Sequence, residues 1–264
     1  MTKDKFQKEE LDKIVVSFIK LTKFVILVFE NNTSGTKENI RRNFIAKSNS
    51  LLNSISILIS ANQEGEAMAL YRMLIERYFY LEYLEKKDKY QEFKDWSYIK
   101  TYESRNNARS NSEFNDSTTK KYLKDSPEQV KKYQKLKLEK IDWVEPKLED
   151  FAKELNLTFL YKLGYDLGSS FIHPRADEGY WDALRLVSKN PTPEFRKLNI
   201  LKNSILIANS ILMYSCNYSE HNFGKYLNLY CNVIFGFLNE GQNLPNLEDI
   251  EKIFFASQMK DLEA

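Results

Sequence analysis

The stretch from Glu64 to Lys87 constrains the fold most, because it has the pattern of one long helix that is apolar on most of its sides. Apolar residues recur in it at the spacing of an α-helix, and Met73, Tyr80 and Leu84 extend the apolar stripe almost all round. A helix of this kind usually lies at the centre of a bundle. We therefore predict that other helices pack around residues 64–87.

The rest of the chain is also typical of helices. Of its 264 residues only 8 are Gly and 6 are Pro, and long amphipathic runs separate these breakers. The predicted helices span residues 5–30, 37–60, 64–87, 90–108, 126–155, 157–172, 180–187, 194–217, 220–238 and 247–262. The helix that starts at Ser126 is expected to end or kink at Pro146. The predicted fold class is therefore all-α: a multi-helix up-and-down bundle with a C-terminal helical extension.

Length and linker positions predict a single all-helical domain over residues 1–264. Within it we expect an N-terminal helix and linker over residues 1–38, a core bundle over residues 39–215, and C-terminal helices over residues 216–264.

Cysteine usage and hydropathy predict a cytoplasmic protein without a membrane segment. Cys216 and Cys231 are the only cysteines, and both lie among apolar residues in helical patterns. The most hydrophobic early segment, Ile14 to Phe29, is interrupted by Lys20 and Lys23 and is shorter than the roughly 20 residues that a membrane span needs.

Familiar catalytic motifs are absent from the sequence. It has no phosphate-binding loop, no zinc-protease motif, no hydrolase elbow and only two histidines, so we expect neither a metal site nor a cofactor. His221 is interpreted as a surface residue in a turn between helices.

Two charged residues, Arg72 and Glu76, stand in the middle of the apolar helix. They are four apart and therefore project from one face. A charge there is costly unless it is paired or used. Two interpretations stay open: the pair links helices, or Glu76 holds Arg72 while its planar guanidinium faces a phosphate or carboxylate.

The second candidate residue is His173, at the end of the helix predicted over residues 157–172. Pro174 disfavours helical geometry at the residue before it, so the histidine is placed at the helix end. It either ends the helix as a satisfied histidine or acts as a general acid or base, because imidazole titrates near neutral pH. Gly164 and Gly168, four apart on the same helix, allow a neighbouring helix to approach closely.

Lysines gather between Lys120 and Lys140, interleaved with Tyr122 and Tyr133. This pattern fits a surface that binds an RNA backbone. It also fits an ordinary solvated helix face, because acidic residues such as Glu128 dilute the charge.

Two short motifs carry a resemblance to known proteins. Ala69-x-x-Arg72-x-x-x-Glu76 with the aromatic run to Tyr83, and Ser170-x-x-His173-Pro174, resemble an all-helical bacterial family of unknown function over residues 39–215. The chain more distantly resembles the HEPN superfamily of toxins, abortive-infection proteins and other RNA-targeting effectors. That resemblance implies a metal-independent ribonuclease that acts as a homo-oligomer, most simply a dimer.

The resemblance also implies roles for particular residues. The HEPN hallmark places an arginine shortly before the histidine, whereas no arginine closely precedes His173, so Arg72 or Arg175 must supply it. His173, Arg72 and Glu76 are then the catalytic candidates. The candidates for substrate binding are Ser169, Ser170, Arg175 and Tyr165.

The expected function is therefore an RNA-directed defence or toxin effector with HEPN-like ribonuclease activity. One alternative is a non-enzymatic interaction or sensor module, in which the acidic end from Glu240 to Glu263 recognises a protein partner. Another is a pocket for an anionic nucleotide-type ligand, lined by Arg72, Tyr71, Tyr165 and His173. Whether the protein is an enzyme stays open, and the catalytic hypothesis requires that Arg72 and His173 line one hollow.

Overall fold

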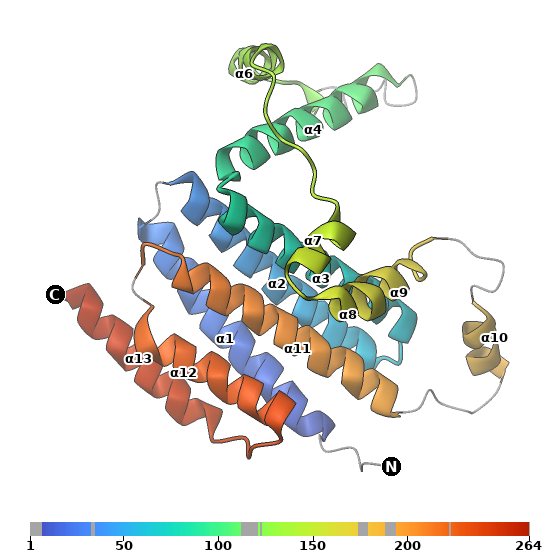
Figure 1. Ribbon diagram of the computed structural model, residues 1–264, viewed down its shortest axis with the longest axis vertical. Helices are drawn as coiled ribbons and strands as arrows, with labels where there is room; N and C mark the ends of the chain where they lie inside the picture. The colour runs from blue at the N-terminus through green and yellow to red at the C-terminus, as the bar shows by residue number, and fades with distance from the viewer. Residues whose placement is uncertain are drawn as a thin grey trace. The chain divides into compact units, whose positions relative to one another are not determined.

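A computed structural model describes residues 7–32, 35–111, 121, 123–173, 179–187, 194–221 and 223–263 (Figure 1). These residues form helices and no strand, which confirms the predicted all-α bundle. The chain divides into two compact units: Met1–Glu82 with Lys147–Ala264, and Tyr83–Pro146. The single domain predicted over residues 1–264 stays a prediction.

The larger unit contains most of the helices. Its elements are α1 (Lys8–Asn32), α2 (Thr36–Ser60), most of α3 (Glu64–Lys87), α7 (Leu148–Glu154), α8 (Thr158–Leu160), the π-helix η2 (Tyr161–Asp166), α9 (Leu167–Ser169), α10 (Tyr180–Val187), α11 (Glu194–Asn217), α12 (Gly224–Phe235), the π-helix η3 (Gly236–Glu240) and α13 (Leu247–Glu263).

The core of this unit lies where α2 packs against both α1 and α11, which Figure 1 shows side by side. The apolar residues of α1 that are completely buried recur at helical spacing: Leu11, Ile14, Phe18, Leu21, Val25 and Phe29. The C-terminal helices α12 and α13 contact each other, and α13 also contacts α1. Helix α3 has the predicted bounds and fully buries Leu74, Ile75 and Phe79.

The smaller unit is built on α4 (Tyr90–Ser110) and α6 (Pro127–Leu138), which pack together. Ser126 caps α6 as its sequence predicts: its hydroxyl accepts a hydrogen bond from the Gln129 backbone, and the Gln129 side chain accepts one from the Ser126 backbone. The buried carboxylate of Asp125 pairs with Arg109 at 2.5 Å and with Arg105 at 3.5 Å. These contacts tie the start of α6 to α4.

The predicted helix from Ser126 to Leu155 is wrong in its length. Helix α6 ends at Leu138, and Lys140 takes a left-handed conformation with φ of 46°, which cannot continue a right-handed helix. The extended stretch that follows carries Trp143, whose ring lies 5.0 Å from Phe93 and 5.8 Å from Trp96. Pro146 therefore stands in this stretch, before α7, and does not itself end α6.

None of the described helices combines the length and the apolar character that crossing a lipid bilayer requires.

Candidate functional site

The candidate site lies where the helical segment Thr158–Ser169 packs on α3. Two glycines of this segment face α3 at very close range. A Cβ atom at Gly168 would lie 2.7 Å from Cβ of Arg72, and one at Gly164 would lie 2.3 Å from Cδ1 of Ile75. The spacing of these glycines therefore serves helix packing, as predicted, and it brings the segment directly against Arg72.

Arg72 is held by side chains from both helices. Its Nε donates a hydrogen bond of 2.8 Å to the Ser169 hydroxyl, and Nη2 donates one of 2.7 Å to the Tyr165 hydroxyl. Its Nη1 reaches a Glu76 carboxylate oxygen at 3.3 Å. The guanidinium carbon also lies 4.2 Å from the centre of the Tyr165 ring. Each of the three guanidinium nitrogens therefore has a contact, and together these contacts fix the orientation of the group.

A π-helix contributes Tyr165 to this arrangement. π-Helical turns are rare and often occur at functional sites. Tyr165 lies within η2, and the Ser169 hydroxyl donates a hydrogen bond of 2.9 Å to the Tyr165 carbonyl while it accepts from Arg72. The Ser169 hydroxyl is thus held by the backbone of the residue whose phenol hydroxyl also contacts Arg72.

The Arg72–Glu76 pair is less buried than its place in an apolar helix indicates. The side chains are 17% and 31% exposed, respectively. A pair of this exposure contributes at most about 1 kcal/mol to stability. The guanidinium therefore remains within reach of solvent while its contacts hold it in place, which suits the recognition of an anion.

The other predicted site residues have different surroundings. His173 lies four residues beyond Ser169, is exposed, and makes no side-chain hydrogen bond with the described part of the chain. The Ser170 hydroxyl donates to the Leu167 carbonyl at 2.6 Å. Tyr71 is buried, and this burial raises the pKa of its phenol. Arg175 lies outside the described residues.

The structure therefore brings together Arg72, Glu76, Tyr165 and Ser169, and it places His173 just after the end of the same helical segment. That Arg72 and His173 line one hollow stays a prediction.

Sequence reasoning missed the ion pair Glu38 with Arg41 on α2, the most deeply buried pair among the described residues. Both side chains are 5% exposed, and Arg41 Nη1 bonds to the Glu38 carboxylate. The second carboxylate oxygen accepts a 2.8 Å hydrogen bond from Ser219, whose oxygen in turn accepts one of 2.9 Å from the His221 backbone. Their spacing along the sequence could have indicated that these charges are buried, because Glu38 and Arg41 lie on the same face of α2 as the buried Ile45.

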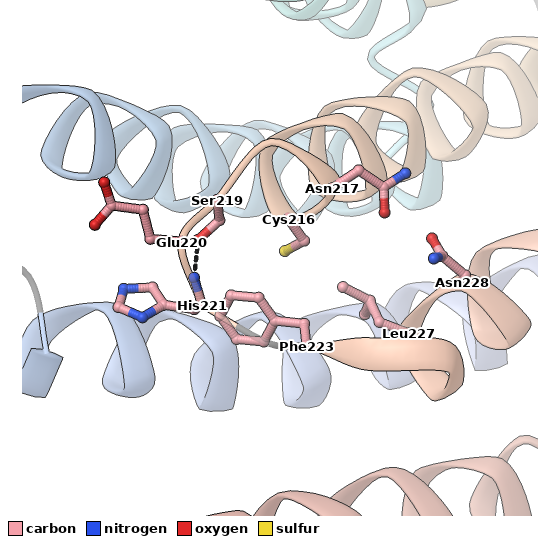
Figure 2. Close-up of a pocket in the computed structure, with 8 residues that line it drawn as sticks. All are labelled: Cys216, Asn217, Ser219, Glu220, His221, Phe223, Leu227 and Asn228. Atoms are coloured by element: carbon pink, nitrogen blue, oxygen red, sulfur yellow. Dashed lines mark hydrogen bonds between the residues drawn. The ribbon is translucent and has the colours of Figure 1, made fainter.

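A cavity of about 380 Å³ lies beside this network, between the end of α11 and the start of α12 (Figure 2). Cys216, Phe223 and Leu227 line its apolar side. Burial, with smaller effects from Cys231 and Glu38, raises the pKa of the Cys216 thiol. The thiol is therefore protonated at neutral pH and is not an activated nucleophile.

The surface interpretation of His221 is wrong in part. His221 is half-buried, and its ring packs edge-on against Phe29 with 4.8 Å between ring centres. Its position in the turn between α11 and α12 agrees with the prediction. The contact with Phe29 was not predicted, because it forms only when α1 packs beside this turn.

In the smaller unit, lysines of the basic region between Lys120 and Lys140 contact other side chains of the same unit. Lys137 donates to Glu103 at 2.7 Å, and Lys132 lies 4.3 Å from the centre of the Tyr98 ring. Tyr133 stacks on Tyr102 with 4.0 Å between ring centres. Lys120 and Tyr122 lie outside the described residues, and RNA binding by this region stays a prediction.

Within the described ranges, no group of three or more His, Cys, Asp and Glu side chains is placed to hold a metal ion. The chemistry available at the Arg72 cluster is anion binding by a held guanidinium, with hydroxyl groups and a carboxylate beside it.

The fold and this cluster define an all-helical protein with an arginine fixed between two helices and within reach of solvent. A model of one protein family matches residues 38–185, more than half of the chain, so the protein belongs to that family: DUF5677, a family of unknown function. This agrees with the predicted resemblance to an all-helical family of unknown function. No curated protein and no solved structure gives a significant match.

Proposed function

We propose that the protein is an RNA-directed defence or toxin effector that acts in the cytoplasm and cleaves RNA without a metal ion. The observation that carries the proposal is the fixed guanidinium of Arg72, held by Ser169 and Tyr165 on the helical segment that leads into His173. A preoriented guanidinium stabilises the charge that develops on a phosphate, and a nearby imidazole can move a proton.

Phosphate binding would replace the weakest contact of Arg72. The distance from Nη1 to Glu76 is 3.3 Å, longer than the contacts with Ser169 and Tyr165. A phosphate oxygen at Nη1 would displace Glu76, which then holds Arg72 in place only in the free protein. In this proposal the substrate-binding group consists of Ser169, Ser170, Arg175 and Tyr165.

The proposed reaction uses the 2′-hydroxyl of RNA as the nucleophile. His173 takes the proton of the 2′-hydroxyl, and the 2′-oxygen then forms a bond to phosphorus. The bond from phosphorus to the 5′-oxygen breaks, and the 5′-oxygen receives a proton from the solvent, to which His173 then releases the proton that it took. The products are a 2′,3′-cyclic phosphate and a free 5′-hydroxyl. Arg72 stabilises the additional negative charge on the phosphate oxygens in the transition state.

Substitution of His173 tests this function directly. In a buffer containing a chelator, the wild-type protein is expected to cleave RNA to fragments with cyclic phosphate ends, and His173→Ala is expected to lower the rate by roughly 100-fold or more. The matched control is His221→Ala, which removes the other histidine and should leave the rate unchanged. Intact RNA at high wild-type concentration, or equal cleavage by His173→Ala, would refute the proposal.

The same cluster also supports a second function, binding of an anionic nucleotide-type ligand without cleavage. The observation that favours it is that the three guanidinium nitrogens of Arg72 already have partners, which is the arrangement of a preformed binding site. A thermal shift with nucleotides that is lost in Arg72→Gln, with RNA left intact, would identify this function.

A non-enzymatic interaction module is the remaining alternative. Arg72 and Glu76 would then only connect helices, and the acidic segment Glu240–Glu263 would recognise a protein partner. Alanine at either position of the pair would lower stability and leave partner binding intact, and expression of the protein would not arrest growth.

We also propose that the protein forms a homodimer through the outer face of the segment Thr158–Ser169 and the turn that follows it. Four apolar side chains at successive four-residue intervals are between 39% and 78% exposed there: Phe159, Leu163, Leu167 and Phe171. A continuous exposed apolar stripe is typical of an interface. A twofold axis level with Tyr165 would set Leu163 against the partner's Leu167.

The charges beside the stripe match this symmetry. Lys162 and Asp166 are exposed, four apart, and lie on the same flank of the stripe. When two copies of a helix pair antiparallel, equivalent flanks meet with their order reversed, so Lys162 would face the partner's Asp166.

A charge swap tests the dimer. Lys162→Asp and Asp166→Lys are each expected to place like charges opposite each other and weaken the dimer about tenfold or more, whereas the double swap should restore it. Sedimentation equilibrium measures the dissociation constants. A monomeric wild-type protein, or a double swap no better than the single variants, would exclude this face.

A further inference from the structure

We propose that Arg77 is a second phosphate-binding residue, which acts together with Arg72 from the other side of Glu76. The inference deepens the proposed function and rests on it, because it requires that a phosphate group binds at the Arg72 cluster. It adds Arg77 to the residues that would contact the ligand.

Arg77 is a half-buried arginine of α3 without a carboxylate partner. Its side chain makes one hydrogen bond, from Nη1 to the Met73 carbonyl oxygen at 2.7 Å, and it forms no ion pair with any of the described residues. The same carbonyl also accepts the backbone N–H of Arg77 in the regular bonding of the helix. Within the described part of the chain, the remaining guanidinium donors are therefore available to a ligand.

The charge of Arg77 is consequently not balanced by direct contact. Burial lowers the pKa of its guanidinium, and the charge of Glu76 opposes this effect. An arginine nevertheless stays protonated at neutral pH. A half-buried cation without a counter-ion reduces stability until an anion pairs with it. These are the properties of an anion-binding residue before its ligand is bound.

The geometry of α3 places Arg77 beside the Arg72 cluster. Around the helix axis, Arg72 lies about 40° from Glu76 on one side, and Arg77 lies about 100° from it on the other. The Arg77 side chain also turns back along the helix, because Nη1 reaches the carbonyl of Met73, the residue next to Arg72. The two guanidiniums therefore flank Glu76 on neighbouring turns of one helix.

The charges of this group favour a phosphodiester as the ligand. Two guanidiniums and one carboxylate leave one positive charge in excess in the free protein. A phosphodiester carries one negative charge and would balance it. Its two non-bridging oxygens could accept hydrogen bonds from Arg72 and Arg77, which would then share the charge that develops in the transition state.

Arg77→Gln is the main variant, and a 2′-O-methyl RNA oligonucleotide is the probe, because it carries phosphodiesters but lacks the nucleophilic hydroxyl. The wild-type protein is expected to bind the probe, and Arg77→Gln should weaken binding about tenfold. The slope of log Kd against log salt concentration should fall by roughly 0.7, the contribution of one phosphate contact on a single strand. Fluorescence anisotropy at several salt concentrations measures both quantities.

The stability of the free protein distinguishes this role from a structural one. Arg77→Gln should leave Tm unchanged or raise it, because an unbalanced charge has been removed. Arg77→Lys retains the charge and should retain most of the salt dependence. A lower Tm of Arg77→Gln, with wild-type affinity and salt dependence, would show that Arg77 is structural and overturn the inference.

The matched control is Arg42→Gln, which removes an arginine that pairs with Glu30 on another part of the surface. It should leave both the affinity for the probe and the salt dependence unchanged. An equal loss of affinity in Arg42→Gln would indicate general charge attraction and overturn the inference, as would a wild-type protein that does not bind the probe.

Failure of this inference is distinguishable from failure of the ribonuclease proposal. If Arg77→Gln binds the probe like the wild-type protein while Arg72→Gln loses RNA cleavage, the ribonuclease stands and the role of Arg77 is refuted. If Arg77→Gln weakens binding while the wild-type protein leaves unmodified RNA intact, Arg77 binds phosphate and the ribonuclease proposal is refuted.

Discussion

Replacing Arg41 with Met is expected to lower the free energy of unfolding by about 3–5 kcal/mol, because it leaves the Glu38 carboxylate buried without its cation. Both side chains are 5% exposed, so water cannot take the place of the guanidinium. Methionine keeps most of the side-chain volume, so the loss reports the charge and not a cavity. Urea denaturation followed by far-UV circular dichroism measures the change.

The neighbouring arginine provides the matched control. Arg42 pairs with Glu30, whose side chain is 63% exposed, and Arg42→Met should cost less than about 1 kcal/mol. The double variant Glu38→Gln with Arg41→Met should regain part of the loss, because no charge is then left unpaired. Equal effects of the two arginine substitutions would contradict the importance of burial at this pair.

Gly168→Ala is expected to destabilise the larger unit by about 1–3 kcal/mol, the usual cost of forcing an extra carbon into a packed contact. The added Cβ would meet Cβ of Arg72 at 2.7 Å and the Met68 carbonyl oxygen at 3.4 Å. Because Cβ of Arg72 moves only with its backbone, the helices must separate. The contacts of Arg72 with Ser169 and Tyr165 should weaken, and any activity that depends on Arg72 should fall.

The matched control for this substitution is Gly65→Ala at the other end of the same contact. A Cβ there would lie 3.4 Å from the Phe171 ring, in ordinary contact. It should leave stability unchanged or raise it by up to about 1 kcal/mol, the usual gain when alanine replaces glycine in a helix. If Gly168→Ala also raised Tm, the close approach at Arg72 would not constrain residue 168.

Local signals predicted most helix boundaries correctly. Helix α3 begins at Glu64 and ends at Lys87 as predicted, and Ser126 with Pro127 marks the start of α6. These features depend on residues within a few positions of each other, so they can be identified without knowledge of the fold. The end of α6 at Leu138 was not predictable in this way, because the stretch after it follows the packing of Trp143 on Phe93 and Trp96.

The candidate site was predicted in part. Arg72, Glu76, Tyr165 and Ser169 were all candidates from the sequence, and they meet in the structure. Which ion pair is buried could not be predicted: Arg72–Glu76 is partly exposed, whereas Glu38–Arg41 is almost completely covered. Both pairs stand on helices with apolar faces, and only the packing of distant segments distinguishes them.

The amino-acid sequence alone determined that this protein is all-helical, where most of its helices begin, and that Arg72 and Glu76 share one face of α3, because these properties arise between neighbours along the chain. Tertiary structure decided which charges are buried, which hydroxyls hold Arg72, and where the cavity between α11 and α12 lies. One of its contacts joins Glu38 and Ser219, which are 181 positions apart along the chain, and no local pattern encodes such a pairing.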